Sequence, residues 1–322
     1  MSCSEFSLIE KYFSQQSISR DDVVVSIGDD AAIMQLAPDE QLVVSTDTMV
    51  EEVHFPKDTH PFDIGYKLMA VNLSDLASMG AQPRWASLAL TLPESNEAWL
   101  KEFSKGLFEL AKKYSVQLIG GDTTRGPLTL SLTLHGTVTE NKYLQRGNAQ
   151  VGDAIFVSGQ LGDAGLALRY LQDKKDVPAI ILARLNQPTP RIELGQSLIG
   201  IAHAAIDISD GLLADLAHIL DASQLGATLQ LEALPLSNSV RSSVANGDWS
   251  LPLSAGDDYE LCFTLPESAI KHLDSQHCLL TRIGTVVSGK GIDCYTPDGK
   301  KLEFHDSGYD HFSSVLRKEE TL

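Results

Sequence analysis

The residues best suited to chemistry are aspartates that recur in a short pattern. In six places an aspartate stands beside glycine, serine or threonine, after a few apolar residues. These aspartate motifs are Gly28-Asp29-Asp30, Ser45-Thr46-Asp47-Thr48, Asn72-Leu73-Ser74-Asp75, Gly120-Gly121-Asp122-Thr123, Asp207-Ile208-Ser209-Asp210-Gly211 and Gly256-Asp257-Asp258. Short carboxylates are good ligands for hard cations, and glycine lets a ligand approach the backbone closely. Metal-assisted chemistry is therefore the first hypothesis.

Scattered single aspartates favour Mg²⁺ over Ca²⁺. Magnesium keeps several waters and is usually shared between one or two carboxylates and substrate phosphates, and the sequence contains no EF-hand spacing. Any one motif alone is better explained as a turn or a helix cap, and Asp210 could cap a helix from Gly211 to Leu220. Six motifs that converged in space would instead form a multi-metal phosphate site, because so many carboxylates repel one another without cations.

Composition limits the class of protein. The chain has 322 residues, of which 43% are hydrophobic, and this is enough for roughly two domains. The 25 lysines and arginines stand against 43 acids, and the formal net charge of −18 argues against nucleic acid and anionic membranes as partners. No apolar run approaches the ~20 residues that span a bilayer, and the cysteines form no metal-binding or disulfide pattern. The expected location is the cytoplasm.

The elements that must position the motifs alternate between helix and strand. Apolar spacing predicts helices over 62–79, 94–114, 164–171 and 191–203, and strands over 23–27, 42–45, 86–92, 116–119, 128–138, 154–157, 228–231 and 259–265. A break at Gln82-Pro83 follows the first of these helices, and a turn over 288–291 joins strands 281–287 and 292–295 in a hairpin. The polar segment 139–152 predicts a boundary between domains 1–149 and 150–322. The predicted fold class is α/β with mixed sheets.

Signatures of other enzyme classes fail. Gly284 to Gly291 nearly matches a phosphate-binding P-loop, but the last position is not serine or threonine, and a strand rather than a helix is expected next. The sequence has no G-x-S-x-G, H-E-x-x-H or protein-kinase motifs. Hydrolase, zinc-protease and protein-kinase functions are therefore disfavoured.

Taken in order, the aspartate motifs resemble the thiamine-monophosphate kinase family, in the superfamily of aminoimidazole ribonucleotide synthetase and selenophosphate synthetase. The match covers nearly the whole chain and includes Val53-His54-Phe55, Asp258-Tyr259-Glu260-Leu261 and Gly308-Tyr309-Asp310-His311-Phe312. The resemblance implies a two-domain subunit that forms a homodimer through N-terminal strands. It implies that residues 1–149 bind ATP and Mg²⁺ and that residues 150–322 complete the site. The implied reaction moves the γ-phosphoryl group of ATP to thiamine monophosphate, directly and in line, with several Mg²⁺ ions.

The resemblance also implies roles for single residues. The implied metal ligands are Asp30, Ser45, Thr46, Asp47, Asp75, Asp122, Asp207 and Asp210. The implied nucleotide contacts are Gly121, Asp122, Arg146 and Ser209. Among these, Asp47, Asp75 and Asp122 are expected to form the main metal scaffold, with Arg146 adding a fixed positive charge. The implied substrate pocket contains His54, Glu260 and one aromatic near the C-terminus, for which Phe312 is favoured over Tyr309.

Two other functions stay open. One is another ATP-dependent enzyme of the same superfamily, such as one that activates an amide oxygen as a phosphate. Selenophosphate synthesis is disfavoured, because Cys3 lies in a glycine-free segment and the first lysine is Lys11. The other is a non-catalytic acidic protein that binds metals or nucleotides.

Overall fold

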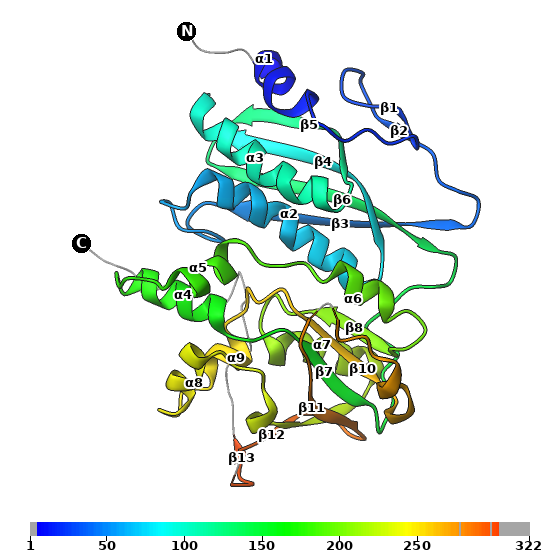
Figure 1. Ribbon diagram of the computed structural model, residues 1–322, viewed down its shortest axis with the longest axis vertical. Helices are drawn as coiled ribbons and strands as arrows, with labels where there is room; N and C mark the ends of the chain where they lie inside the picture. Colours follow the sequence, from blue (N-terminus) through cyan, green and yellow to red (C-terminus); the bar gives the residue numbers. More distant parts are fainter. Residues whose placement is uncertain (1–4, 277, 297, 303–322) are drawn as a thin grey trace.

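Two sheets, each packed against helices, form the body of the molecule (Figure 1). The structure is a computed structural model that describes residues 5–276, 278–296 and 298–302. In Figure 1 the sheet of the first half lies above that of the second half, and α2 and α6 lie between them. The mixed α/β fold is as predicted.

The first half is built on a four-stranded sheet. Its strands are β3 (Glu40–Val50), β4 (Gln82–Leu92), β5 (Gln117–Arg125) and β6 (Thr129–Thr139), in the order β3-β6-β4-β5. The chain before the sheet forms α1 (Glu5–Ile9), the π-helix η1 (Glu10–Ser14), β1 (Val23–Val25) and β2 (Ile33–Met34), and β1 pairs with β2. Helices α2 (Pro61–Ser78) and α3 (Glu97–Lys113) cover one face of the sheet (Figure 1).

Helix α2 is the central element of the fold. Proline at its first position and the His60 side chain, which accepts a hydrogen bond from the Phe62 N–H at 3.3 Å, favour its start. It packs closely on α3, since a Cβ on Gly65 would lie only 2.1 Å from the carbonyl oxygen of Phe103. Most of its residues are buried, including the polar Asn72 and Ser74. A helix buried on several faces can carry side chains to two domains at once.

The second half is built on a seven-stranded sheet. Its strands are β7 (Ala154–Ser158), β8 (Ala204–Asp207), β9 (Gly226–Gln230), β10 (Leu261–Leu265), β11 (Leu280–Val287), β12 (Gly291–Tyr295) and β13 (Lys301–Leu302). Their order is β13-β12-β9-β11-β7-β10-β8. The helices are α4 (Asp163–Gln172), α5 (Ala179–Asn186), α6 (Ile192–Ser197), α7 (Leu212–Ser223), α8 (Asn238–Val244) and α9 (Ser250–Ser254), with short 3₁₀ turns η2 (Leu231–Ala233) and η3 (Glu267–His272).

The predicted hairpin is wrong. Strands β11 and β12 do follow one another closely, but β9 lies between them, antiparallel to β11 and parallel to β12. The predicted end of the helix before Gln82-Pro83 is confirmed, since α2 ends at Ser78, but β4 already begins at Gln82 and runs through Pro83 with an irregular register toward β6. At the failed hairpin, pairing with a distant strand overrides the local turn signal.

Asp47 and Asp122, each predicted just after a strand, lie inside one, whereas Asp75 lies inside the helix that was predicted to contain it. Asp47 lies within β3, Asp75 within α2 and Asp122 within β5. Their side chains are consequently directed by the periodicity of the strand or helix and not by a turn. In the described part of the chain, no helix is both long and apolar enough to cross a membrane.

Candidate active site

Three aspartates from distant parts of the chain meet between the two sheets. Asp47 lies on β3, Asp75 near the end of α2 and Asp207 at the end of β8. The Ser74 hydroxyl donates a hydrogen bond to Asp207 Oδ2 at 2.7 Å, which links α2 to the second sheet. The Ser45 hydroxyl donates to Asp75 Oδ2, which links α2 to β3. We call Asp47, Asp75 and Asp207 the junction carboxylates.

Strand alternation determines which part of the Ser45-Thr46-Asp47 motif faces this site. Side chains two apart on a strand share a face, so Ser45 and Asp47 lie on the side of α2. Thr46 lies on the opposite, exposed face, where its Oγ1 is 2.9 Å from Oγ1 of Thr133 on β6. The Thr46 side chain is therefore separated from the junction carboxylates, and its role as a metal ligand stays a prediction.

The negative charge of the junction carboxylates is not balanced by positive charge around them. Burial, with the charges of Asp75 and Asp207, raises the pKa of Asp47 to about 7. Burial and the charge of Asp75 likewise raise the pKa of Asp207 to about 7. Burial raises the pKa of Asp75 as well, although a hydrogen bond from Ser45 and the charge of Arg146 oppose it. Facing acids with raised pKa values are typical of functional sites, and the charge of Arg146 acts to lower the pKa of Asp75 and of Asp207.

The loop after β8 brings Ser209 and Asp210 to the same region. The backbone N–H groups of Ser209, Asp210 and Gly211 donate to Asp215 Oδ2 at 3.0, 3.0 and 3.1 Å. Burial, with the charges of Asp207 and Asp210, raises the pKa of Asp215 to about 8. The motif pattern missed Asp215 because this residue lies inside α7 and not beside a glycine. The sequence feature that could have identified Asp215 is its position in the first turn of a helix, where the helix dipole favours acidic residues.

The motif before β10 meets this loop and also reaches α2. The Asp257 N–H donates to the Ser209 carbonyl at 2.8 Å, and Asp257 Oδ1 lies 2.9 Å from Nζ of the buried Lys67. Asp257 and Tyr259 have φ values of 60° and 49°, unusual for residues other than glycine. Burial and the nearby charges of Asp257 and two junction carboxylates raise the pKa of the Tyr259 phenol. Tyr259 and Lys67 therefore border the site. Tyr259 belongs to one motif of the family resemblance, but no role was predicted for either residue.

A second set of predicted residues lines a pocket of about 830 Å³ in the first half. Asp30 lies in the loop between β1 and β2, while Gly121 and Asp122 lie on β5. Gly121 has a φ of 155°, and a Cβ here would lie 1.8 Å from the carbonyl oxygen of Leu88. Only glycine fits this close approach.

The sheet register separates this pocket from the junction carboxylates. Asp47 pairs with Leu132 of β6, Leu132 with Leu88 of β4, and Leu88 with Gly121 of β5. Three strand spacings correspond to about 14 Å between Asp47 and Gly121. Within one chain, Asp122 therefore does not join Asp47 and Asp75 in a single cluster, and the predicted metal scaffold is divided into two groups.

Glu260 is buried, and its carboxylate is fully engaged within the protein. Oε1 accepts from Nη2 of Arg184 at 2.7 Å and from Nη2 of Arg191 at 2.6 Å. Oε2 accepts from Nε of Arg191 at 2.6 Å and from the Ser158 hydroxyl at 2.5 Å. A carboxylate has about four acceptor sites, so direct contact with a substrate would require displacing one of these donors. The geometry does not support the predicted substrate contact, and the two arginines were not foreseen.

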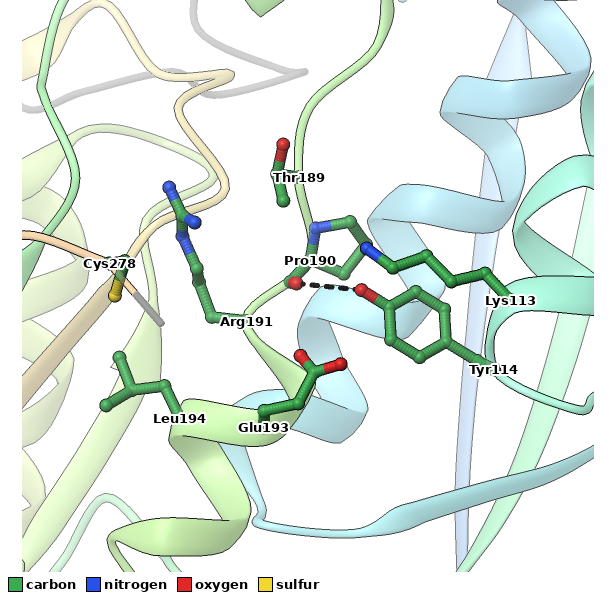
Figure 2. A pocket seen from close by; sticks show the side chains of 8 residues that line it. All are labelled: Lys113, Tyr114, Thr189, Pro190, Arg191, Glu193, Leu194 and Cys278. Atoms are coloured by element: carbon green, nitrogen blue, oxygen red, sulfur yellow. Dashed lines mark hydrogen bonds between the residues drawn. The ribbon is translucent and has the colours of Figure 1, made fainter. Parts of the chain in front are cut away.

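A small cavity of about 200 Å³ lies beside Arg191 (Figure 2). Lys113 and Tyr114 border it from the end of α3, and the Tyr114 hydroxyl donates to the Pro190 carbonyl at 3.2 Å. Glu193 lines it as well, so that two cations face one acid. None of the predicted site residues lines this cavity.

The remaining substrate-pocket predictions have mixed outcomes. His54 is partly buried after β3, and its Nδ1 accepts the Val50 N–H at 3.0 Å, so the side chain is held by its own turn. Tyr309 and Phe312 lie outside the described residues. The roles of all three in substrate binding stay predictions.

The junction carboxylates fit a hard cation in their chemistry. In residues 5–276, 278–296 and 298–302, no three His, Cys, Asp or Glu side chains are placed closely enough to hold one ion as they stand. Their donors are nevertheless carboxylate oxygens with uncompensated charge, the ligand type that Mg²⁺ prefers, buried at Asp207 and partly buried at Asp47 and Asp75. A dication would stabilise the ionised forms that burial and mutual repulsion now disfavour.

Comparison with known sequences gives a consistent result over the whole chain. The family model "AIR synthase related protein, N-terminal domain" matches residues 28–138, and "AIR synthase related protein, C-terminal domain" matches residues 150–296. A thiamine-monophosphate kinase of Haemophilus influenzae is 46% identical over 97% of this chain and 99% of its own length. A protein of the same name from Escherichia coli K12 is 44% identical over 98% of this chain and 100% of its own length.

Solved structures agree with these relatives. A thiamine-monophosphate kinase from Stenotrophomonas maltophilia superposes with a TM-score of 0.85 at 46% identity, covering 94% of this chain and 99% of that one. A structure described as "AaThiL complexed with AMPPCP and TMP" has a TM-score of 0.75 at 33% identity, covering 89% of this chain and 92% of that one. The hydrogenase maturation protein HypE of E. coli, at 22% identity and a TM-score of 0.78, shares the fold.

Proposed function

The chain belongs to the thiamine-monophosphate kinase family, and from this premise we propose that it transfers the γ-phosphoryl group of ATP to thiamine monophosphate, giving thiamine diphosphate. Relatives at 44–46% identity carry that name over nearly their full length. A structural relative at 33% identity has been solved with AMPPCP and TMP, which supports ATP as the donor. The homodimer and the cytoplasmic location stay predictions.

The observation that carries the proposal is the set of junction carboxylates with raised pKa values. The triphosphate of ATP and the phosphate of thiamine monophosphate are both anions that repel each other, and a site for both must supply positive charge. Asp47, Asp75 and Asp207 would hold Mg²⁺, with Asp30 and Asp122 as ligands for further ions at the pocket. When bound, Mg²⁺ neutralises phosphate oxygens during transfer. The exposed Arg146 would add a permanent positive charge, since its charge already lowers the pKa of Asp75 and of Asp207.

The acceptor determines which residues are not required. A phosphate monoester has a second pKa of about 6, so it already presents an anionic oxygen at neutral pH. No general base is needed, and the chain's task is to position the two substrates in line. Tyr259 and the Asp210 loop lie where they can border the reacting groups without exchanging protons. We infer direct transfer, and isolation of a phosphorylated enzyme in the absence of thiamine monophosphate would exclude it.

Glu260 has a different role in this proposal from the predicted one. Its carboxylate holds Arg184 and Arg191 together, so it would act on the substrate through these arginines and not by direct contact. Replacing Glu260 with alanine should then raise the Michaelis constant for thiamine monophosphate more than that for ATP, and it should also reduce stability. Equal effects on the two constants would exclude a place in the substrate pocket.

The test is ADP formation with and without thiamine monophosphate, with the product identified by chromatography. We expect ADP release that depends on both thiamine monophosphate and Mg²⁺, and an activity reduced about 100-fold in Asp47→Asn and Asp122→Asn. Asp176→Asn, at an exposed position before α5, is the matched control. Full activity in both variants would contradict the metal assignment.

The same assay separates the alternatives. ADP release that requires another substrate and not thiamine monophosphate would indicate a different ATP-dependent enzyme of the superfamily. Nucleotide and metal binding without turnover would indicate a non-catalytic binding protein.

A further inference from the structure

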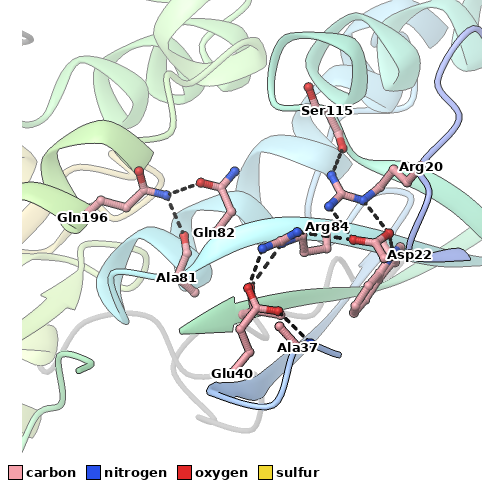
Figure 3. Close-up of polar contacts among 11 residues, drawn as sticks. Arg20, Asp22, Ala37, Glu40, Ala81, Gln82, Arg84, Ser115 and Gln196 are labelled. Carbon is pink, nitrogen blue, oxygen red and sulfur yellow. Dashed lines mark hydrogen bonds and ion pairs between the residues drawn. The ribbon is translucent and has the colours of Figure 1, made fainter. Parts of the chain in front are cut away.

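Arg84 on β4 bonds two separated parts of the chain at once (Figure 3). Its Nη1 lies 3.2 Å from Asp22 Oδ2, and its Nη2 lies 2.6 Å from Glu40 Oε1. Its Nε donates to Thr137 Oγ1 at 3.2 Å, and Thr137 in turn donates to Glu40 at 3.1 Å. The planar guanidinium group thus uses all three nitrogens, which a lysine could not reproduce.

Asp22 and Glu40 stand at the two ends of the segment that contains the Asp30 loop, and we call these two ends its stems. Asp22 immediately precedes β1 and Glu40 opens β3, so β1, β2 and the loop of residues 27–32 between them lie within the bridged segment. That loop lines the 830 Å³ pocket opposite Gly121 and Asp122. Most residues between the stems are exposed, so the core does little to hold them.

The stem at Asp22 is itself well anchored. Arg20 donates to both of its oxygens at 2.9 and 2.6 Å, and Trp85 Nε1 donates to Oδ1 at 2.9 Å. Although partial burial opposes them, these hydrogen bonds hold the pKa of Asp22 below its usual value. The Arg20 N–H and Nη1 also reach Gln117 and the Ser115 carbonyl beside β5, as Figure 3 shows for Ser115. Within the described residues, the second stem, Glu40, forms its ion pair with Arg84, and it also accepts hydrogen bonds from the Thr137 hydroxyl and, at 3.3 Å, from the Ala37 N–H.

We propose that Arg84 is a positioning residue of the nucleotide and metal pocket. By holding Asp22 and Glu40 to β4, it keeps the Asp30 loop in place opposite Asp122. The role rests on the proposed function, because it assigns this pocket to ATP with Mg²⁺. Loss of Arg84 weakens binding of the nucleotide and its metal, and leaves thiamine monophosphate, the phosphoryl acceptor, unaffected.

The first measurement is amide hydrogen exchange of residues 23–39 in the full chain without ligands. Arg84→Met is expected to speed exchange about tenfold in this segment and not in β9 or β11 of the second sheet. Arg84→Lys keeps the charge but reaches only one carboxylate, and should lie between Arg84→Met and the parent protein. Arg282→Met, which removes an exposed pair with Glu267, is the matched control and should leave residues 23–39 unchanged.

The second measurement is affinity for AMPPCP with Mg²⁺, together with the two Michaelis constants. Arg84→Met should weaken AMPPCP binding and raise the ATP constant about fivefold, with the thiamine monophosphate constant changed less than twofold. Unchanged exchange in residues 23–39, or equal rises in both constants, overturns the role of Arg84. If the Arg84→Met protein does not fold, the same exchange and affinity measurements on Arg84→Lys decide whether Arg84 has this role. A parent protein that neither binds AMPPCP nor forms thiamine diphosphate overturns the proposed function, whereas hydrogen exchange still decides whether Arg84 holds the loop.

Discussion

Two buried acidic centres of this protein are built in opposite ways. At the junction carboxylates, three acids face one another, and burial and mutual repulsion raise their pKa values. At Glu260, one acid receives hydrogen bonds from two arginines and a serine. The first centre has too little positive charge nearby to offset its acids, whereas at the second Glu260 is paired with two arginines.

The difference shows which centre requires a ligand. Glu260 is a compensated charge, so its arginines and carboxylate stabilise one another without help from outside. The junction carboxylates are uncompensated, and they become stable anions only when a cation arrives. A buried acid is therefore evidence of a functional site here only where the protein itself does not neutralise it.

The largest expected effect concerns the compensated centre. Glu260→Gln removes the charge that Arg184 and Arg191 share, and should lower the free energy of unfolding by about 3–5 kcal/mol. Urea denaturation measures this. Glu267→Gln, at an exposed pair with Arg282, is the control and should change stability by less than about 1 kcal/mol. A Glu260→Gln protein as stable as this control would show that the two centres do not differ as described.

The next effect concerns catalysis at the uncompensated centre. Asp75→Asn removes a ligand and one negative charge while leaving the helix intact, so we expect the turnover number to fall about 100-fold at saturating substrates. Stability should not fall, because the remaining acids repel less. If Asp75→Asn instead lost stability as Glu260→Gln does, the junction would be a structural centre.

A smaller effect is the pH dependence of stability without metal. The pKa of Asp47 is about 7 in the folded protein and ordinary in the unfolded chain, so its contribution is present at low pH and lost as pH rises toward 7. With EDTA, stability should fall between pH 5 and 8 by about 2 kcal/mol more in the parent protein than in Asp47→Asn.

Magnesium should reverse this trend. Because Mg²⁺ binds the ionised carboxylates, it should raise the melting temperature more at pH 8 than at pH 5. Equal stabilisation at both pH values would mean that the ion binds elsewhere.

The smallest effect concerns Lys67 and Asp257, a one-to-one pair between α2 and the loop before β10. The lysine side chain is 5% exposed and the aspartate 28%, so water can partly replace the lysine. Lys67→Met should lower the free energy of unfolding by about 1 kcal/mol. A double-mutant cycle with Asp257→Asn should give a coupling energy of similar size. Additive effects would show that the pair does not hold the two halves together.

Local elements were predicted well where their pattern is long and self-contained. The helix expected over 62–79 is α2, because a buried helix has a regular apolar period and Pro61 at its start. The hairpin expected after Val287 failed, because β9 supplies better pairing partners for both strands than they are for each other. Strand order depends on distant segments, and a turn signal contains nothing about them.

The sequence predicted which residue types form the site, but it did not predict which of these residues lie next to one another. The aspartate motifs include Asp47, Asp75 and Asp207, which do meet, but they also include Asp122, whose neighbour Gly121 lies three strand spacings, about 14 Å, from Asp47. Arg184 and Arg191 were missed because each acts through Glu260, which is distant in the sequence, and Asp215 was missed because it does not stand beside a glycine.

The sequence by itself determined the supply of carboxylates, the glycines beside them and the helix that carries Asp75, since these follow from residue identity and short-range periodicity. Only the tertiary structure decided which acids face other acids and which face arginines. The physical reason is that desolvation and Coulomb energy depend on burial and separation in space, and the partners here come from segments as distant as β3, α2 and β8.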